Sequence, residues 1–263
     1  MQLGLSGKSA LVCAASKGLG KASALALASE GANVAICARD RVTLGAALEE
    51  IGRATSARAT AIAADLSKPE DISRLVAGTV KAFGGLDILV TNTGGPKSAP
   101  FDALTDADWT SAVDSMLLSV VRLVREAIPH MRARGGGRII NVTSISVKQP
   151  IDSLVLSNSL RAAVTGLSKT LASELAHDNI LVNCVAPGYT GTDRVVELSE
   201  AIAAREGTTA EAVQRRTESK IPLGRMATAE EFGSVVAFLA SAPASYITGV
   251  TLQVDGGFVR SLL

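Results

Sequence analysis

The sequence predicts an α/β protein with a doubly wound parallel sheet of seven strands, arranged in three layers with helices on both faces. Short runs rich in valine and isoleucine alternate with longer segments of helical period, which is the pattern of repeated βαβ units. The short runs are apolar at consecutive positions, as expected of parallel strands that are buried on both faces. The 263 residues are 47% hydrophobic and contain no stretch that reads as a linker, so residues 1–263 are predicted to form a single domain.

The individual elements follow from these two periods in chain order. The short apolar runs predict strands at Ser9–Ala15, Asn33–Ala38, Arg58–Ala63, Asp87–Thr91, Arg138–Thr143, Leu181–Ala186 and Val250–Val254. The segments between them predict helices at Leu19–Glu30, Arg41–Arg53, Pro69–Phe83, Asp106–Arg134, Ser153–Ala176 and Thr228–Leu239.

One long connection, Thr190–Arg225, follows the sixth strand and is polar and charged rather than core-forming. In sheets of this kind ligands bind beyond the carboxyl ends of the strands, so this segment is a candidate mobile lid over a substrate. The alternative is a solvated helical hairpin without a role in ligand binding.

Composition favours a small-molecule ligand in a reducing compartment. A formal net charge of +1 gives no electrostatic reason to expect nucleic acid or an anionic membrane as partner. The cysteines Cys13, Cys37 and Cys184 lie inside apolar runs, which indicates buried thiols rather than a disulfide framework. No signal segment or apolar run long enough to span a bilayer is found, so the cytoplasm is the expected location, and no metal site is predicted.

A glycine-containing turn follows the first strand. The residues Ser16, Lys17, Gly18, Leu19 and Gly20 lead from that strand into an alanine-rich helix. Glycines at such a point let the backbone approach a pyrophosphate, and the amino end of the helix stabilises its negative charge. The turn therefore predicts a dinucleotide site.

Later motifs occur in an order that resembles the short-chain dehydrogenase/reductase family over nearly the whole chain. They are Asp65-Leu66, Asn92-Thr-Gly94-Gly95, Asn141-Val-Thr-Ser144, Pro187-Gly188, Tyr246-Ile-Thr-Gly249 and Asp255-Gly-Gly257. The resemblance implies a Rossmann fold, an activity similar to that of 3-oxoacyl-acyl-carrier-protein reductases, and a homotetramer or homodimer. It also implies that Asp65 contacts the adenine, that Asn92 and Gly94 line the ribose side, and that further cofactor contacts come from Leu66, Pro187, Gly188, Thr190 and Thr192.

The first strand departs from the family pattern, because Cys13-Ala14 stands where relatives usually have Thr-Gly. An alanine is expected to tolerate this turn only with a negative φ, and its Cβ would push the pyrophosphate outward. We therefore expect Ala14 to reduce cofactor affinity.

Charge near the second strand favours NADP(H), with NAD as the alternative. The strand ends Cys37-Ala38-Arg39, without the acidic residue that would bind a ribose 2′-hydroxyl, and Lys17 lies in the glycine turn. Two cations and no carboxylate suit a 2′-phosphate, which a guanidinium binds through paired hydrogen bonds.

The family resemblance implies an Asn-Ser-Tyr-Lys catalytic set, and three of its four positions are substituted here. Ser144 is retained, whereas the Tyr position falls on Ser157, the Lys position on Arg161 and the Asn position on Met116. Residues 157 and 161 share one helix face. A serine hydroxyl is a far poorer acid than a phenol, but Arg161 remains protonated, can hold the ribose and can supply a positive field at a developing alkoxide.

Two nearby groups are candidates for the missing acid. Tyr189 follows Pro187-Gly188 in a loop that passes near the nicotinamide in the family, and Lys148 lies just beyond Ser144. Packing and solvation, respectively, are the ordinary roles of such residues.

Three alternative functions are consistent with the sequence. The first is an NADP(H)-dependent oxidoreductase that acts on a small carbonyl or hydroxyl compound with a non-standard proton donor. The second is a catalytically impaired, dinucleotide-binding or regulatory homologue. The third is non-redox chemistry at an anion site formed by Ser144, Ser157 and Arg161, although His130 and His177 lie in helical segments remote from both serines and provide no Ser-His-Asp arrangement.

Overall fold

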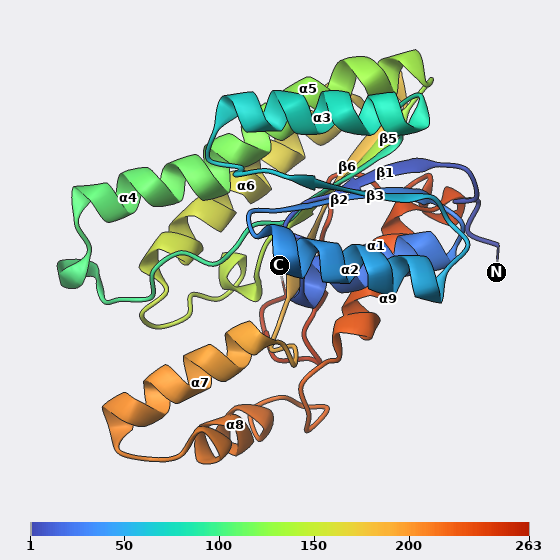
Figure 1. Ribbon diagram of the computed structural model, residues 1–263. Helices are drawn as coiled ribbons and strands as arrows, with labels where there is room; N and C mark the ends of the chain where they lie inside the picture. The colour runs from blue at the N-terminus through green and yellow to red at the C-terminus, as the bar shows by residue number, and fades with distance from the viewer. Residues whose placement is uncertain (1, 263) are drawn as a thin grey trace.

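A seven-stranded parallel sheet forms the centre of the computed structural model, which describes residues 2–262 (Figure 1). The strand order is β3-β2-β1-β4-β5-β6-β7, with the reversal of winding between β1 and β4. The strands are β1 (Ser9–Val12), β2 (Asn33–Ala38), β3 (Ala59–Ala63), β4 (Ile88–Thr91), β5 (Gly137–Val142), β6 (Ile180–Pro187) and β7 (Thr251–Val254). The predicted fold class is confirmed.

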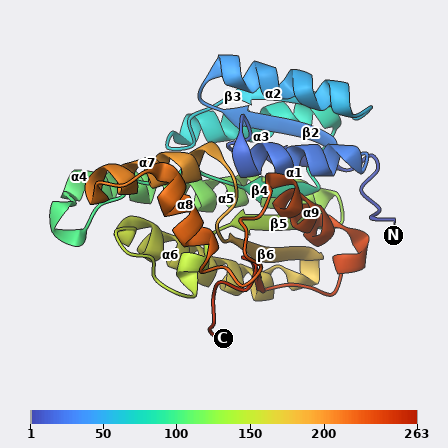
Figure 2. The same ribbon diagram turned by 90° about the horizontal axis from the view of Figure 1, so that it is seen from below.

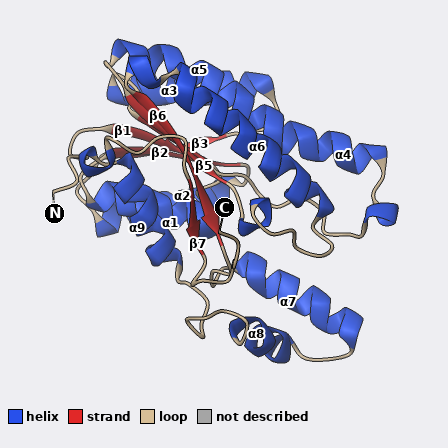
Figure 3. Ribbon diagram, turned by 180° about the vertical axis from the view of Figure 1, so that it is seen from behind, coloured by secondary structure: helices blue, strands red, loops and turns tan. Residues whose placement is uncertain are grey.

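Helices cover both faces of this sheet, as Figures 1 and 3 show. One layer contains α1 (Gly18–Ser29), α2 (Arg41–Ala54) and α9 (Ala229–Ala240), and the other contains α3 (Pro69–Phe83), α5 (Ser119–Ala133) and α6 (Val155–Glu174). Alternate residues of each strand enter the two separate hydrophobic cores: Val12 and Ile36 pack on the α1 side, whereas Leu11 and Ala35 pack on the α3 side. The three cysteines are buried free thiols, as predicted.

The long helix predicted at Asp106–Arg134 is interrupted. It begins as α4 (Asp106–Ala112), continues as a π-helix (Val113–Leu118) and then becomes α5. Periodicity gave no sign of the wider turn, because the spacing of four residues between Ala112, Met116 and Val120 also fits the i, i+4 pattern of an α-helix. The helix predicted at Ser153–Ala176 begins later, at Val155, after Ser153 adopts a φ of +59°.

The polar connection 190–225 folds into two helices, α7 (Asp193–Glu206) and α8 (Ala210–Glu218). Figure 1 shows this pair away from the two main helical layers, and in Figure 2, seen from below, the pair lies in front of the rest of the molecule. Thr190 pairs with Ala227 in an isolated parallel bridge, which ties the two ends of the excursion together. Within residues 2–262, every helix is too short or too polar to cross a bilayer.

Candidate functional site

The turn after β1 places an alanine in a left-handed conformation. Ala14 has a φ of +47°, which corrects the expectation that φ would stay negative. The neighbouring amides explain the constraint, since Cys13 donates to the carbonyl of Val90 at 3.0 Å and Ala15 donates to the carbonyl of Cys37 at 2.9 Å. These bonds hold the chain between β4 and β2 on either side of Ala14. The sheet therefore imposes a conformation that costs an L-residue about 1–2 kcal/mol.

Gly18 and Gly20 are required in this turn for two different physical reasons. Gly18 has a φ of +56°, whereas a Cβ at Gly20 would collide with the carbonyl of Ala14. That carbonyl also accepts from Asn92 Nδ2 at 3.3 Å, which joins two of the predicted cofactor residues. No side chain caps the first turn of α1 and no acidic residue lies in it, so its amides are suited to a phosphate. Ser16 lies beside these amides, and Leu19 packs on the core.

Lys17 is paired with acidic residues of α7. Its Nζ lies 3.2 Å from Asp193 Oδ2 and 4.0 Å from Glu197 Oε1, and all three side chains are more than half exposed. Exposed pairs of this kind contribute little stability, so a phosphate could displace them. A cavity of about 260 Å³ lies between the turn and the start of α7, and it is lined in part by Gly18 and Thr192.

Arg39 and Asp65 follow the ends of β2 and β3, and the charge of Arg39 acts on the Asp65 carboxylate without a direct contact between them. Arg39 is exposed. Hydrogen bonds from Ser67 to the Asp65 carboxylate, at 3.0 Å from the amide and 2.8 Å from the hydroxyl, lower the pKa of Asp65, and the Arg39 charge lowers it further. Leu66 packs against the core of the α3 side. Gly94 is exposed, and a Cβ there would meet nothing within 4 Å, so no close approach within the chain requires a glycine at this position.

Ser144 and the guanidinium of Arg161 both lie near the carboxyl end of β5. Arg161 Nη1 donates to the carbonyl of Val142 at 2.8 Å, only two residues before Ser144. Ser144 Oγ accepts from the amide of Ser146 at 3.1 Å, which leaves its own proton available. Burial lowers the pKa of Arg161 to about 10, so this guanidinium remains charged at neutral pH. A hydroxyl donor and a positive charge are therefore found at the same end of β5.

The side chains of Ser157 and Met116, at two further positions of the predicted catalytic set, are both buried. Ser157 lies one helical turn before Arg161 on α6 and is 6% exposed. Met116, in the π-helix, packs in an apolar cluster with Leu156 and Leu160. An apolar side chain thus occupies the position that the family resemblance assigns to an asparagine.

The loop after β6 contributes packing and one unsatisfied hydroxyl. Tyr189 lies edge-on to Phe258 at a centroid distance of 5.3 Å, and burial raises its pKa, which makes it a weaker acid than a free phenol. Pro187 ends β6, and a Cβ at Gly188 would collide with Asp255. Thr190 Oγ1 is buried without a hydrogen-bond partner among residues 2–262. Lys148 follows the short 3₁₀ turn Ile145–Val147 and takes no part in the hydrogen bond between Arg161 and Val142.

Comparisons with known proteins identify the family. A family model described as enoyl-(acyl carrier protein) reductase matches residues 13–259. A 3-oxoacyl-[acyl-carrier-protein] reductase of Staphylococcus epidermidis is 36% identical over 95% of this chain and 98% of its own length. The chain belongs to the short-chain dehydrogenase/reductase family.

Solved structures of short-chain reductases share the complete architecture. L-sorbose reductase of Gluconobacter frateurii, solved with NADPH and L-sorbose, has a TM-score of 0.95 and 34% identity, with 100% of both chains covered. YwfH, an NADPH-dependent reductase involved in bacilysin biosynthesis, has a TM-score of 0.92 and 30% identity, with 97% of this chain and 99% of that chain covered.

Sequence reasoning missed one polar group of this short-chain dehydrogenase/reductase. Ser146 is buried next to Ser144, and its Oγ has no hydrogen-bond partner among residues 2–262. The pattern Ser144-Ile-Ser146 was visible, but only the structure shows that the second hydroxyl is buried and unsatisfied. An unpaired buried hydroxyl costs free energy, so Ser146 and Thr190 are two costly polar positions at this end of the sheet.

The strain at Ala14 leads to a stability prediction for this short-chain dehydrogenase/reductase. Ala14→Gly should raise the free energy of unfolding by roughly 0.5–1 kcal/mol, because relief of the left-handed strain exceeds the entropy that glycine gains in the unfolded chain. Thermal and denaturant unfolding measure the difference. Ala15→Gly is the matched control and should destabilise, since Ala15 is buried and does not have a positive φ. A destabilised Ala14→Gly variant would contradict the strain.

Proposed function

We propose that this chain is an NADP(H)-dependent oxidoreductase that acts on a small carbonyl or hydroxyl compound, with Ser144 and Arg161 as the groups that bind the reacting oxygen. The observation that carries this proposal is the bond of Arg161 to the carbonyl of Val142, which holds the guanidinium at the end of β5, two residues before Ser144. A 3-oxoacyl-like substrate is the class favoured by the Staphylococcus epidermidis relative.

The proposed cofactor site combines the residues at the carboxyl ends of the strands. The uncapped amino end of α1 and Gly18 fit a pyrophosphate, and Arg39 with Lys17 fits a 2′-phosphate. Asp65, Asn92 and Gly94 are placed along the same edge, and the unpaired hydroxyl of Thr190 marks the other end. NADPH, when bound, supplies a hydride. The NADPH-dependent reductases among the structural neighbours support this choice of cofactor.

Each catalytic side chain has a defined task in the proposal. Ser144 Oγ donates a hydrogen bond to the carbonyl oxygen while it accepts from the amide of Ser146. Arg161 stabilises the negative charge that develops on that oxygen, an effect that grows in a partly desolvated site. The oxygen takes its final proton from water, because Tyr189 is packed against Phe258 with a raised pKa and Ser157 is buried.

The α7–α8 hairpin acts as the lid in this proposal. Its start lies beside Gly18, and the Lys17 pairs with Asp193 and Glu197 hold it against the turn. When Lys17 turns to a 2′-phosphate, these weak pairs are exchanged for a charge-assisted contact, which couples cofactor binding to the position of α7. A homodimer or homotetramer is proposed from the family resemblance.

A second candidate function is dinucleotide binding without turnover. The apolar packing of Met116 and the 6% exposure of Ser157 favour it, because both remove polar groups from the side of the site where a proton would have to arrive. The glycine turn and the end of β5 would then bind cofactor without chemistry.

Cofactor titration separates these functions. We expect NADPH to bind more tightly than NADH and Arg39→Ala to narrow the difference by about tenfold, the effect of one charge-assisted contact. The change in NADPH fluorescence on binding gives both Kd values. Arg53→Ala, on the last turn of α2, removes the same charge far from the turn and should leave the ratio unchanged.

A panel of ketones and acyl thioesters with NADPH then tests turnover. Oxidation of NADPH supports the reductase, whereas tight binding without oxidation of NADPH supports the second candidate. Equal affinities for NADPH and NADH in the wild type would overturn the proposed cofactor specificity.

A further inference from the structure

A second cavity lies at the opposite edge of the sheet, at the amino ends of the strands. It has a volume of about 180 Å³ and lies between the residues that precede β1, the residue that precedes β4 and the turn from α5 into β5. The proposed cofactor site lies at the carboxyl ends of the same strands, so the two sites are separated by the length of the sheet. This cavity has no part in the reaction proposed above.

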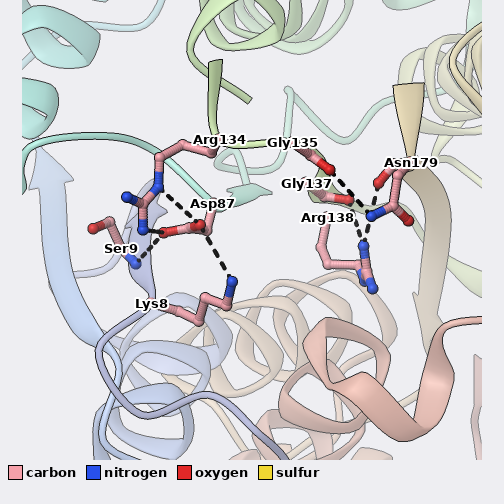
Figure 4. A network of polar contacts seen from close by, with 8 residues as sticks. All are labelled: Lys8, Ser9, Asp87, Arg134, Gly135, Gly137, Arg138 and Asn179. Atoms are coloured by element: carbon pink, nitrogen blue, oxygen red, sulfur yellow. Dashed lines mark hydrogen bonds and ion pairs between the residues drawn. The ribbon is translucent and has the colours of Figure 1, made fainter. Parts of the chain in front are cut away.

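Four charged side chains line this cavity, and three of them are cations. The lining contains the cations Lys8, Arg134 and Arg138 and one carboxylate, Asp87, which leaves two positive charges in excess. Figure 4 shows them as two groups: Asp87 is joined to Lys8, Ser9 and Arg134, whereas Arg138 is joined to Gly137 and Asn179 but not to Asp87.

The Asp87 group leaves its cations incompletely paired. The carboxylate is 5% exposed and receives a short bond of 2.8 Å from the Ser9 amide. Its contacts to the side chains are longer: 3.5 Å to Lys8 Nζ, and 3.3 Å and 3.4 Å to Arg134 Nε and Nη2. Contacts of this length are weak, so both cations keep donor capacity for another anion.

Arg138 has no counter-ion within residues 2–262. Its Nη1 donates to two backbone carbonyls, Gly137 at 2.9 Å and Asn179 at 3.4 Å. Its Nε is buried and has no hydrogen-bond partner in the same part of the chain. Burial lowers the pKa of this guanidinium, so its charge is partly desolvated and is met by backbone carbonyls and not by a carboxylate.

Three backbone carbonyls of the lining already accept hydrogen bonds. The carbonyls of Gly137 and Asn179 accept from Arg138, and that of Gly135 accepts from Asn179 Nδ2 at 3.2 Å. The lining therefore combines unused side-chain donors with excess positive charge. This chemistry selects an anion over a cation or a neutral ligand.

We propose that the cavity lined by Lys8, Arg134 and Arg138 is a binding site for a small doubly charged oxyanion, such as phosphate or the phosphate group of a small metabolite. Two negative charges match the excess of two positive charges. The oxyanion accepts from the donors of Lys8, Arg134 and Arg138 that their present contacts leave over.

Thermal unfolding with inorganic phosphate tests the site, at constant ionic strength with chloride as the balancing anion. A tenfold excess of phosphate over its Kd should raise the Tm by about 3 °C or more relative to chloride. Arg138→Gln should abolish this shift, because glutamine keeps a polar end but has no charge. Lys8→Gln should reduce the shift, and it is expected to fold because the Lys8 side chain is 48% exposed.

Arg39→Ala is the control that locates the anion, since phosphate could also bind at the cofactor turn. The shift should persist in Arg39→Ala if phosphate binds in the second cavity, and its loss there would overturn the proposal. The absence of a shift in the wild type, or an unchanged shift in Arg138→Gln, would also overturn it. If Arg138→Gln does not fold, Lys8→Gln decides: a reduced shift supports the site and an unchanged shift refutes it.

Discussion

Ser144→Ala is expected to lower kcat by about a hundredfold or more while Ser157→Ala changes it little. Removal of one preorganised donor from the oxygen that gains charge in the transition state commonly costs this much. Ser144 Oγ has its proton free because it only accepts from Ser146, whereas Ser157 is buried beside an apolar cluster. Steady-state rates with NADPH and a substrate from the ketone and thioester panel measure the effect.

Arg161→Met is the companion variant, because methionine keeps the aliphatic volume and removes the charge. We expect it to raise KM for NADPH and to lower kcat, since the guanidinium is proposed to serve both the ribose and the reacting oxygen. Thermal unfolding controls for the lost bond to Val142. If Ser157→Ala abolishes turnover while NADPH still binds, the assigned roles are wrong and Ser157 is the essential hydroxyl.

The double substitution Ser157→Tyr with Arg161→Lys is expected to raise turnover on a simple ketone by at least about tenfold. A phenol next to an ammonium group supplies the general acid that serine lacks, and general acid catalysis typically contributes a hundredfold or more. The phenol must fit where Ser157 is only 6% exposed, so some of this gain is offset by crowding. Single-turnover oxidation of NADPH measures the chemical step.

Two measurements make this result interpretable. NADPH titration and thermal unfolding must show that the double variant is folded and binds cofactor. Met116→Asn added to the pair then tests the apolar cluster with Leu156 and Leu160. A rate that increases only in the triple variant would show that a polar path past residue 116 is also required, whereas no increase in any folded variant would refute a simple loss of the proton donor.

The fold and the location of the cofactor turn follow from sequence because both depend on local patterns. Apolar runs identified all seven strands, and the strand-glycine-helix order placed the turn at residues 14–20. The first strand was predicted too long at its end because Cys13 and Ala14 are apolar, while the chain turns there under hydrogen bonds from β4 and β2. Those partners are distant in sequence and cannot be read from the local pattern.

Features that depend on distant residues were not predictable from the sequence. The positive φ of Ala14 is imposed by two neighbouring strands, and the ion pairs of Lys17 come from a helix more than 170 residues later. The anchoring of Arg161 to Val142 and the unpaired Nε of Arg138 depend on packing between segments. The two guanidinium groups look alike in the sequence, and only their surroundings distinguish them.

The π-helix at Val113–Leu118 keeps two helices in phase. From Ala112 through Met116 and Val120 to Val124, buried residues recur at every fourth position, a longer repeat than an α-helix provides. The wider turn absorbs the difference, so α4 and α5 present one continuous apolar stripe. Deletion of a single residue here would rotate one helix against the other by about 100°. This segment is therefore tolerant of a changed side chain at position 116 and intolerant of a changed chain length, so its divergence is expected to proceed by substitution and not by insertion or deletion.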